Sequence, residues 1–175
     1  MNLQEMIALQ PFTESDFDTL KGWVKDADAL FQFAGPIFQY PLTDEQLQAY
    51  IQMLDKKPLK VVLLATGQTI GHCELNFENG QRRLSRILVG DQSMRGKRIG
   101  EQMVRQMAEM LFQDSNVQEI DLNTFDWNIG AIKCYEKVGF RIDHSQTAPM
   151  SIKGTVWTKV NMRLSRIDFH KQNKV

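Results

Sequence analysis

The hydrophobic positions change their spacing several times along the chain, and each change predicts a new element. A short apolar segment from Met6 to Leu9, ended by Pro11, predicts a first strand. Ser15 is then a suitable cap for a helix whose apolar residues, between Phe17 and Val24, share one face. The chain is therefore predicted to open with one strand and one helix.

The next segment, from Phe31 to Pro41, is rich in aromatic and turn-forming residues but has no helical spacing, which predicts a shaped loop. Thr43 then caps a second helix that runs through Leu54 and stops before Pro58.

Three strand-like runs follow, and the turn residues between them predict an antiparallel meander. The runs are Leu59–Ala65, Ile70–Phe77 and Arg82–Val89. The helical apolar stripe of Ile99–Phe112 comes next, and Glu119–Thr124 returns to strand spacing. A strand, a helix and a further strand in this order predict a parallel crossover.

The last part of the chain predicts a helix and two closing strands. Asn128 can cap this helix, and Gly139 is the expected left-handed residue at its end. The closing strands are Phe140–Asp143 and Thr155–Arg163, and Lys171–Val175 is expected to be a frayed tail. The pattern predicts one α+β domain over residues 1–175, with a core of about 6–164 and a C-terminal tail of 165–175.

Composition narrows the classes of function. The chain has 175 residues, 42% of them hydrophobic, and its 21 Lys and Arg balance its 21 Asp and Glu. No overall charge therefore draws it to nucleic acid or to an acidic membrane, and no apolar run approaches the roughly 20 residues that cross a bilayer. Two cysteines and three histidines form no pattern of metal ligands. We expect a soluble cytoplasmic protein without a metal.

The segment Arg95–Gly100 opens the helix that follows the meander. The first turn of a helix presents unpaired N–H groups and partial positive charge, glycines allow close approach to the backbone, and the basic side chains add charge. A diphosphate would fit here, although a solvated basic turn is equally compatible with the spacing. The spacing matches neither a P-loop nor a dinucleotide fingerprint.

A second segment, Asn128–Phe140, follows the strand that ends near Asn123. Helical geometry places Asn128, Ile132 and Tyr135 on one side, so the tyrosine hydroxyl can face the same groove as the cap. The alternative is an ordinary packed tyrosine.

Taken together, these two segments resemble the GNAT superfamily of N-acetyltransferases. Its phosphate loop, Gln/Arg-x-x-Gly-x-Gly/Ala, is matched at Arg95, Ile99 and Gly100, whereas Arg98 stands where a glycine is expected. Its Asn-x-x-Ala-x-x-x-Tyr-x-x-x-Gly-Phe signature is matched in full from Asn128 to Phe140. The strand Gly71–Leu75 resembles the branch that includes ribosomal-protein N-terminal and polyamine acetyltransferases.

The resemblance implies a mixed, mostly antiparallel sheet of about six to seven strands with about four helices, in which the fourth and fifth strands splay apart. Acetyl-coenzyme A would lie in the gap, with its pantetheine arm along the fourth strand and one backbone N–H polarising the thioester carbonyl. A helical φ at Arg98 would still present its N–H to the diphosphate. The residues implied to bind the donor are Ile87, Leu88, Val89, Arg95, Gly96, Lys97, Arg98, Ile99, Gly100, Asn123, Asn128 and Tyr135.

The chemistry requires a proton acceptor, because an amine with a pKa near ~10.4 is protonated at neutral pH and cannot attack a thioester. Strand alternation puts Cys73 and Leu75 on the core face and Glu74 on the other, which makes Glu74 the candidate base, directly or through water. An exposed strand carboxylate is the alternative, and Asp91 is the reserve base. Tyr135 is the candidate acid that protonates the departing thiolate.

An acyl-cysteine intermediate is not expected at Cys134, because no histidine lies near it in the sequence. Direct attack in a ternary complex follows. Phe31, Phe38 and Glu74 are the expected contacts of the acceptor, which is a small-molecule amine or a peptide N-terminus. The sequence leaves open a monomer or a homodimer, and a catalytically degenerate acyl-CoA-binding sensor as the alternative function.

Overall fold

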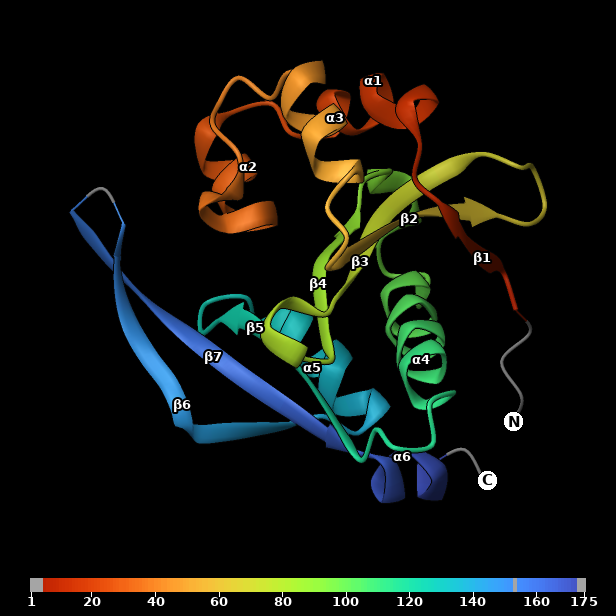
Figure 1. Ribbon diagram of the computed structural model, residues 1–175, viewed down its shortest axis with the longest axis vertical. Coiled ribbons are helices and arrows are strands. Elements are labelled where there is room, and N and C mark those ends of the chain that lie inside the picture. Colours follow the sequence, from red (N-terminus) through yellow and green to blue (C-terminus); the bar gives the residue numbers. More distant parts are fainter. Residues whose placement is uncertain (1–4, 153, 173–175) are drawn as a thin grey trace.

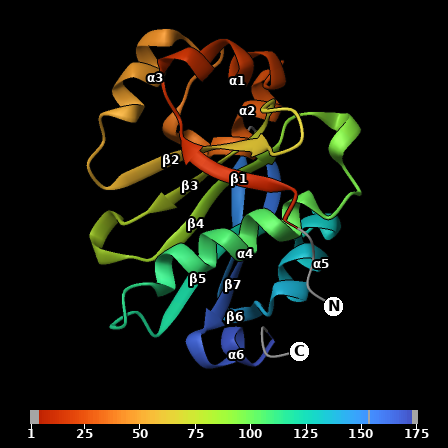
Figure 2. The same ribbon diagram turned by 90° about the vertical axis from the view of Figure 1, so that its right-hand side faces the viewer.

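The computed structural model describes residues 5–152 and 154–172, and it consists of one mixed sheet between two layers of helices (Figures 1 and 2). The strands are β1 (Ile7–Pro11), β2 (Lys56–Leu63), β3 (Thr69–Asn76), β4 (Arg83–Val89), β5 (Glu119–Phe125), β6 (Arg141–Ile152) and β7 (Thr155–Ser165). The helices are α1 (Phe17–Trp23), α2 (Ala27–Ala34), α3 (Asp44–Ile51), α4 (Ile99–Phe112), α5 (Ile129–Val138) and α6 (Arg166–Gln172). Short 3-10 turns are η1 (Glu14–Asp16), η2 (Gly35–Ile37), η3 (Glu78–Gly80) and η4 (Gln92–Met94).

The sheet has the strand order β1-β2-β3-β4-β5-β7-β6. Every neighbouring pair is antiparallel except β4 and β5, which are parallel as the crossover through α4 requires. This topology confirms the predicted α+β fold with seven strands.

Each face of the sheet has its own apolar core. Helix α4 packs against β1, β3, β4 and α5, and its residues Met103 and Met107 are fully buried with Leu84 and Ile120 from the sheet. Helices α1, α2 and α3 cover the other face, where Leu20 and Leu47 form a second core (Figure 2).

The pair β4 and β5 holds together only at its beginning. The paired residues are Arg83 with Asp121 and Leu84 with Leu122, and no further residues of these two strands pair with each other. The strands separate beyond this point, because β4 contains a bulge opposite β3 between His72 and Glu74. The predicted splay of these two strands is confirmed.

Two helices agree closely with the sequence pattern. Helix α4 has the predicted bounds, and α5 is capped by Asn128, whose side chain accepts a hydrogen bond from the Ala131 N–H at 3.3 Å. Gly139 ends α5 with φ 112°, a left-handed conformation that suits glycine.

The prediction of about four helices is wrong, because the described chain has six. The segment expected to be a loop is partly helical: α2 covers residues 27–34, capped by Asp26, which accepts from the Ala29 N–H at 2.7 Å. Helix α6 occupies most of the expected C-terminal tail, including Lys171, while residues 173–175 lie outside the described part.

The predicted cap Ser15 is also wrong. Thr13 begins the first helical turn, because its N–H donates to the Asp16 carboxylate at 2.9 Å and Ser15 lies inside η1. Thr13 and Asp16 therefore form a capping box, in which the Asp16 carboxylate accepts the hydrogen bond from the Thr13 N–H.

Pro58 was expected to stop a helix, but α3 ends at Ile51 and Pro58 lies within β2. The Pro58 carbonyl accepts from the N–H of Phe12, the residue after β1, at 3.2 Å. Because the nitrogen and the carbonyl of one strand residue point to the same side, the Pro58 nitrogen faces away from β3. A missing N–H there breaks no bond to β3, which is why the strand tolerates proline.

The closing strands are longer than predicted. Strands β6 and β7 form a hairpin that extends past the sheet toward α2 (Figure 1). At its outer part Trp157 meets Phe31 of α2 with ring centroids 5.9 Å apart. The hairpin therefore borders the region in front of the separated strands.

No helix among the described residues has the length and apolar character to cross a bilayer.

Candidate active site

A cavity of about 500 Å³ lies where β4 and β5 separate. Helix α2 contributes Phe31 and Phe33 to its wall, β5 contributes Asn123, Thr124 and Phe125, and the β6–β7 hairpin contributes Met150 and Lys159. These segments are distant in the sequence. The sheet order places β7 beside β5, and α2 packs against β4.

The bulge of β4 is centred on Arg86, which has a positive φ of 48°. The Arg86 carbonyl oxygen lies 3.0 Å from Nδ1 of His72, and because a carbonyl only accepts, this ring nitrogen donates. Burial lowers the pKa of His72 to about 4, so the ring is neutral at physiological pH. The bulge is thus fixed by a neutral, fully buried histidine.

Beyond the bulge, Leu88 and Val89 pair with His72 and Gly71 of β3 but have no partner on β5. Ile87 and Leu88 line the cavity, whereas Val89 does not. The side of β4 that faces β5 therefore has the form of an unpaired strand edge, and a pantetheine arm with amide groups can pair with such an edge.

The basic turn before α4 differs in one respect from the expectation. Arg98 caps α4 with φ 63° and ψ 16°, which is left-handed rather than right-handed helical. Glycine adopts this conformation without strain, which explains why the family pattern has glycine at this position. The Arg98 guanidinium is paired with Glu101 at 3.1 Å, and Arg105 shares the same carboxylate at 3.6 Å.

Other residues of this turn have distinct positions. Arg95 lines the cavity, and Gly96 has a positive φ of 76° with open space where a Cβ would be. Ile99 is buried in the core, and a Cβ on Gly100 would meet Sγ of Cys134 at 3.3 Å, so Gly100 allows α4 to pack against α5. Lys97 does not line the cavity.

Tyr135 of α5 lines the cavity, and its side chain is largely buried against Phe140. Within the described residues the structure shows no hydrogen-bond partner for its hydroxyl. Burial raises the pKa of Tyr135, so the hydroxyl is protonated at neutral pH and can donate. Asn123 and Asn128 line the same wall.

The family whose sequence profile matches this chain is described as "Acetyltransferase (GNAT) domain", and the match covers residues 7–141. The chain belongs to the GNAT acetyltransferase family. Its activity is acetyl-CoA-dependent N-acetylation, because this is the reaction of the family.

Two curated relatives and two solved structures agree with this assignment. The chain is 29% identical over 162 residues to aminoglycoside N(6')-acetyltransferase type 1 of Klebsiella pneumoniae and of Serratia marcescens, covering 85% of this chain and 80% of each relative. The structure of AAC(6')-Ib with ribostamycin and coenzyme A is similar in fold, with a TM-score of 0.72, 24% identity and coverage of 95% and 97% of the two chains. Spermidine N-acetyltransferase from Vibrio cholerae with CoA and spermine has a TM-score of 0.76 at 14% identity, with coverage of 95% and 99%.

Glu74 has a different environment in this GNAT protein from the one expected. Its side chain is fully buried and accepts from Nη1 of Arg86 at 2.6 and 2.7 Å and from the Tyr50 hydroxyl. Burial raises the pKa of Glu74, although Arg86 opposes the effect. The predicted alternation is confirmed, since Cys73 and Leu75 lie in the α4 core. Glu74, however, is neither exposed nor part of the cavity wall.

Two further expected site residues lie outside the cavity wall. Phe38 packs in the second core with its ring 5.2 Å from that of Tyr50, so it does not reach the cavity and cannot contact the acceptor there. Asp91 caps η4 by accepting from the Ser93 N–H at 2.9 Å, and hydrogen bonds to Ser93 lower its pKa. Asp91 is not among the cavity residues, and its role as the reserve base stays a prediction.

Cys134 adjoins Tyr135 but does not line the cavity. Burial raises the pKa of its thiol to about 11, so the nucleophilic thiolate is scarce at neutral pH.

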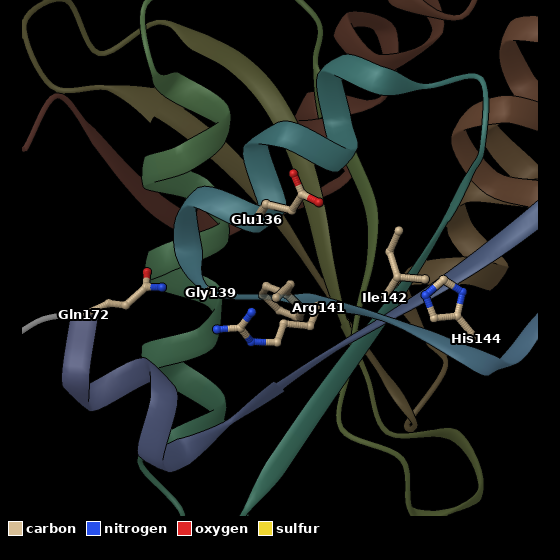
Figure 3. A pocket seen from close by; sticks show the side chains of 7 residues that line it. Glu136, Gly139, Arg141, Ile142, His144 and Gln172 are labelled. Atoms are coloured by element: carbon tan, nitrogen blue, oxygen red, sulfur yellow. The ribbon is translucent and has the colours of Figure 1, made fainter.

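A second hollow of about 350 Å³ lies at the C-terminal end of α5 (Figure 3). Glu136, Arg141, His144 and Gln172 surround it. No residue of β4 or β5 lines it, so this hollow is separate from the gap between those strands.

Several cavity residues were not foreseen from the sequence. Arg83 and Arg86 follow an ordinary strand pattern, and no local signal marks the bulge. Lys159 lies in a strand predicted only as a closing element. Their positions depend on the sheet order and on the hairpin, so sequence spacing alone contained no indication of them.

Proposed function

We propose that this GNAT enzyme acetylates the primary amine of a small molecule, by direct attack of the amine on acetyl-CoA within a ternary complex. The observation that carries the proposal is the cavity at the gap between β4 and β5, with the protonated Tyr135 hydroxyl in its wall. A peptide N-terminus is the second candidate acceptor. The contact between Phe31 and Trp157 ties α2 to the hairpin and borders the acceptor side, which favours a small molecule.

The donor would lie along β4 and end at the first turn of α4. Backbone groups of Ile87, Leu88 and Val89 would pair with the pantetheine arm, and one of their N–H groups would face the thioester oxygen. Arg95 and Gly96, together with the free N–H groups of the 14-residue helix α4, would hold the diphosphate. Asn123 and Asn128 would border the arm on the β5 side.

Bound acetyl-CoA supplies the acetyl group as a thioester. The neutral amine forms the new C–N bond as the C–S bond breaks, and the amide product loses one proton. Tyr135 donates its hydroxyl proton to the thiolate and regains one from solvent, so the overall products are the acetylated amine and coenzyme A. This requires the ternary complex, because the chain offers no activated thiol at Cys134.

The proton of the amine needs an acceptor, and Glu74 cannot receive it by direct contact in this arrangement. Arg86 lines the cavity and donates to both carboxylate oxygens of Glu74, whereas Glu74 itself does not line the cavity. A role for Glu74 as base through water therefore stays a prediction. The contact that the structure does show is the ion pair by which Glu74 holds Arg86 at the bulge of β4.

The proposal is tested by measuring thiol release from acetyl-CoA over a panel of amines, with acetylated products identified by mass spectrometry. Kanamycin and spermidine belong in the panel because related proteins bear these names, and peptides with free N-termini test the second acceptor class. Initial rates at several concentrations of both substrates should give intersecting lines, whereas parallel lines would contradict direct attack.

The alternative of a degenerate acyl-CoA sensor predicts calorimetric binding of acetyl-CoA without turnover. This alternative was based on Arg98, which stands where the phosphate-loop pattern has glycine. Because Arg98 adopts the left-handed conformation available to glycine, the path of the loop backbone is the one that the glycine pattern favours. The structure therefore offers no separate support for the sensor.

A further inference from the structure

The charged side chains that line the cavity at the β4–β5 gap are all basic. They are Arg83, Arg86, Arg95 and Lys159, and among the described residues no aspartate or glutamate lines this cavity. The sequence as a whole is neutral, so this local excess arises from the fold and not from the composition.

Two of these four charges are compensated from outside the cavity. Arg83 donates to both oxygens of Asp121, at 2.9 and 2.6 Å, and Arg86 donates to both oxygens of Glu74. Neither carboxylate belongs to the cavity wall. The charges of these two arginines are therefore largely balanced by Asp121 and Glu74.

The side chains of Arg95 and Lys159 have no hydrogen-bond or ion-pair partner in the described part of the chain. Arg95 belongs to the turn before α4, where the diphosphate of the donor is expected. Lys159 lies on β7, opposite Phe125 of β5 and Ala148 of β6, so β5 stands between its strand and β4 in the sheet order. Lys159 therefore belongs to the acceptor side of the cavity.

The neighbours of Lys159 define the surroundings of this charge. Strand alternation puts Lys159 on the same face of β7 as Trp157 and Asn161. Trp157 contacts Phe31 and also Phe125, with ring centroids 4.8 Å apart in the second pair. A cation next to an aromatic wall thus faces the space available to the acceptor.

We infer that the acceptor is a primary amine that also carries an anionic group, a carboxylate or a phosphate, which Lys159 binds. The inference rests on the proposed function and names its substrate class. A polycationic amine such as an aminoglycoside or a polyamine would enter this cavity without meeting a carboxylate, and like charges would oppose its binding. An anionic group at Lys159 instead gains a charge-assisted hydrogen bond.

The test uses pairs of acceptors that differ in charge but not in their amine. The dipeptide Gly-Phe is compared with Gly-Phe amide, and glucosamine 6-phosphate with glucosamine, so that the carboxylate and the phosphate are tested separately. The anionic member of at least one pair should have a kcat/KM roughly 10-fold higher, which is the effect of one charge-assisted contact of about 1.4 kcal/mol. The advantage should shrink at high ionic strength.

Variants of Lys159 assign the effect to this side chain. Lys159→Met should abolish the preference by raising the KM of the anionic acceptor, with the KM of acetyl-CoA unchanged. Lys159→Glu should reverse the charge of the subsite and raise kcat/KM for spermidine. Lys57→Met, which removes an exposed lysine on β2, is the matched control and should change neither preference.

The outcomes separate the two proposals. The inference about the acceptor is overturned if neutral or polycationic amines have a kcat/KM equal to that of anionic amines, or if Lys159→Met keeps the preference. The proposed acetyltransferase function is unaffected by either result. If acetyl-CoA binds and no amine of any charge is acetylated, the proposed function fails and the inference fails with it.

Discussion

Nη1 of Arg86 lies 2.6 Å and 2.7 Å from the two carboxylate oxygens of Glu74, and this ion pair joins the bulge of β4 to β3 at the cavity wall. The Glu74 side chain is fully buried and the Arg86 side chain is 11% exposed. Removing one partner would leave the other charge in a desolvated site. The pair therefore couples the stability of the protein to the shape of the β4 edge.

We expect Glu74→Gln to lower the free energy of unfolding by about 3 kcal/mol, because it leaves the Arg86 charge without a counter-charge. Urea denaturation measures the loss. The double variant Glu74→Gln with Arg86→Met should recover part of it, since the buried charge is then absent. A double variant less stable than the sum of the single variants would contradict this account.

The same variant tests whether Glu74 is the base. If Glu74 only positions Arg86, the acidic limb of the pH profile of kcat/KM persists in Glu74→Gln while the rate falls. Loss of that limb would instead assign the ionisation to Glu74.

His72 should make the stability depend on pH. Its pKa falls from 6.5 to about 4 on folding because burial disfavours the charged ring. This site costs no stability above pH 6.5, but the protein becomes less stable as the pH falls from 6.5 toward 4, because the unfolded chain then binds a proton that the folded chain excludes. This one site accounts for about 3 kcal/mol over that window.

Urea denaturation at pH 7, 5.5 and 4 measures this dependence in the wild type and in His72→Asn. The slope is the readout, since the variant loses stability at every pH. An unchanged slope in His72→Asn would show that other groups cause the dependence.

Tyr135→Phe should lower kcat by roughly 100-fold with little change in the KM for acetyl-CoA, because only the proton donor is removed. Steady-state kinetics with a fixed amine gives both constants. Tyr40→Phe is the matched control, since the Tyr40 hydroxyl donates to the Lys25 carbonyl at 2.8 Å and lies outside the cavity wall. Equal kcat values for the two variants would remove Tyr135 from the reaction.

The left-handed conformation of Arg98 predicts a stability difference between two substitutions. Arg98→Gly and Arg98→Ala both lose the ion pair with Glu101, but only alanine keeps a Cβ in the left-handed region. The glycine variant should be more stable by about 1 kcal/mol, or roughly 2–4 °C in Tm. Calorimetry of the two variants tests this, and equal melting temperatures would indicate that the loop relaxes.

The parts of this protein that the sequence predicted share one physical property: their signals are local. The apolar stripe of α4, the Asn128 cap and the glycine at 139 act within one or two helical turns, so they can be identified from neighbouring residues. The helix at 27–34 was missed, although its Asp26 cap is a local signal, because the aromatic content of the segment suggested a loop.

All seven strands were predicted, and the bounds of β3, β4 and β5 agree to within one residue, whereas β6 and β7 are longer than predicted. The alternation in β3 correctly separated Cys73 and Leu75 from Glu74. Alternation assigns a face but not a partner, so it could not show that Arg86 and Tyr50 enclose the carboxylate. Phe38 illustrates the same limit, because an aromatic residue in a cavity loop and one in a small core look alike in sequence.

The amino-acid sequence by itself determined the family, the seven strands in their order along the chain, four of the six helices, and the residues Arg95, Asn128 and Tyr135 that face the gap, because spacing and capping encode these features over short distances. Only the tertiary structure decided that Glu74 is paired, that Arg98 is left-handed and that Lys159 enters the cavity. The positions of Glu74 and Lys159 depend on which strands become neighbours, and the free energy of that choice is distributed over contacts between residues far apart in the chain.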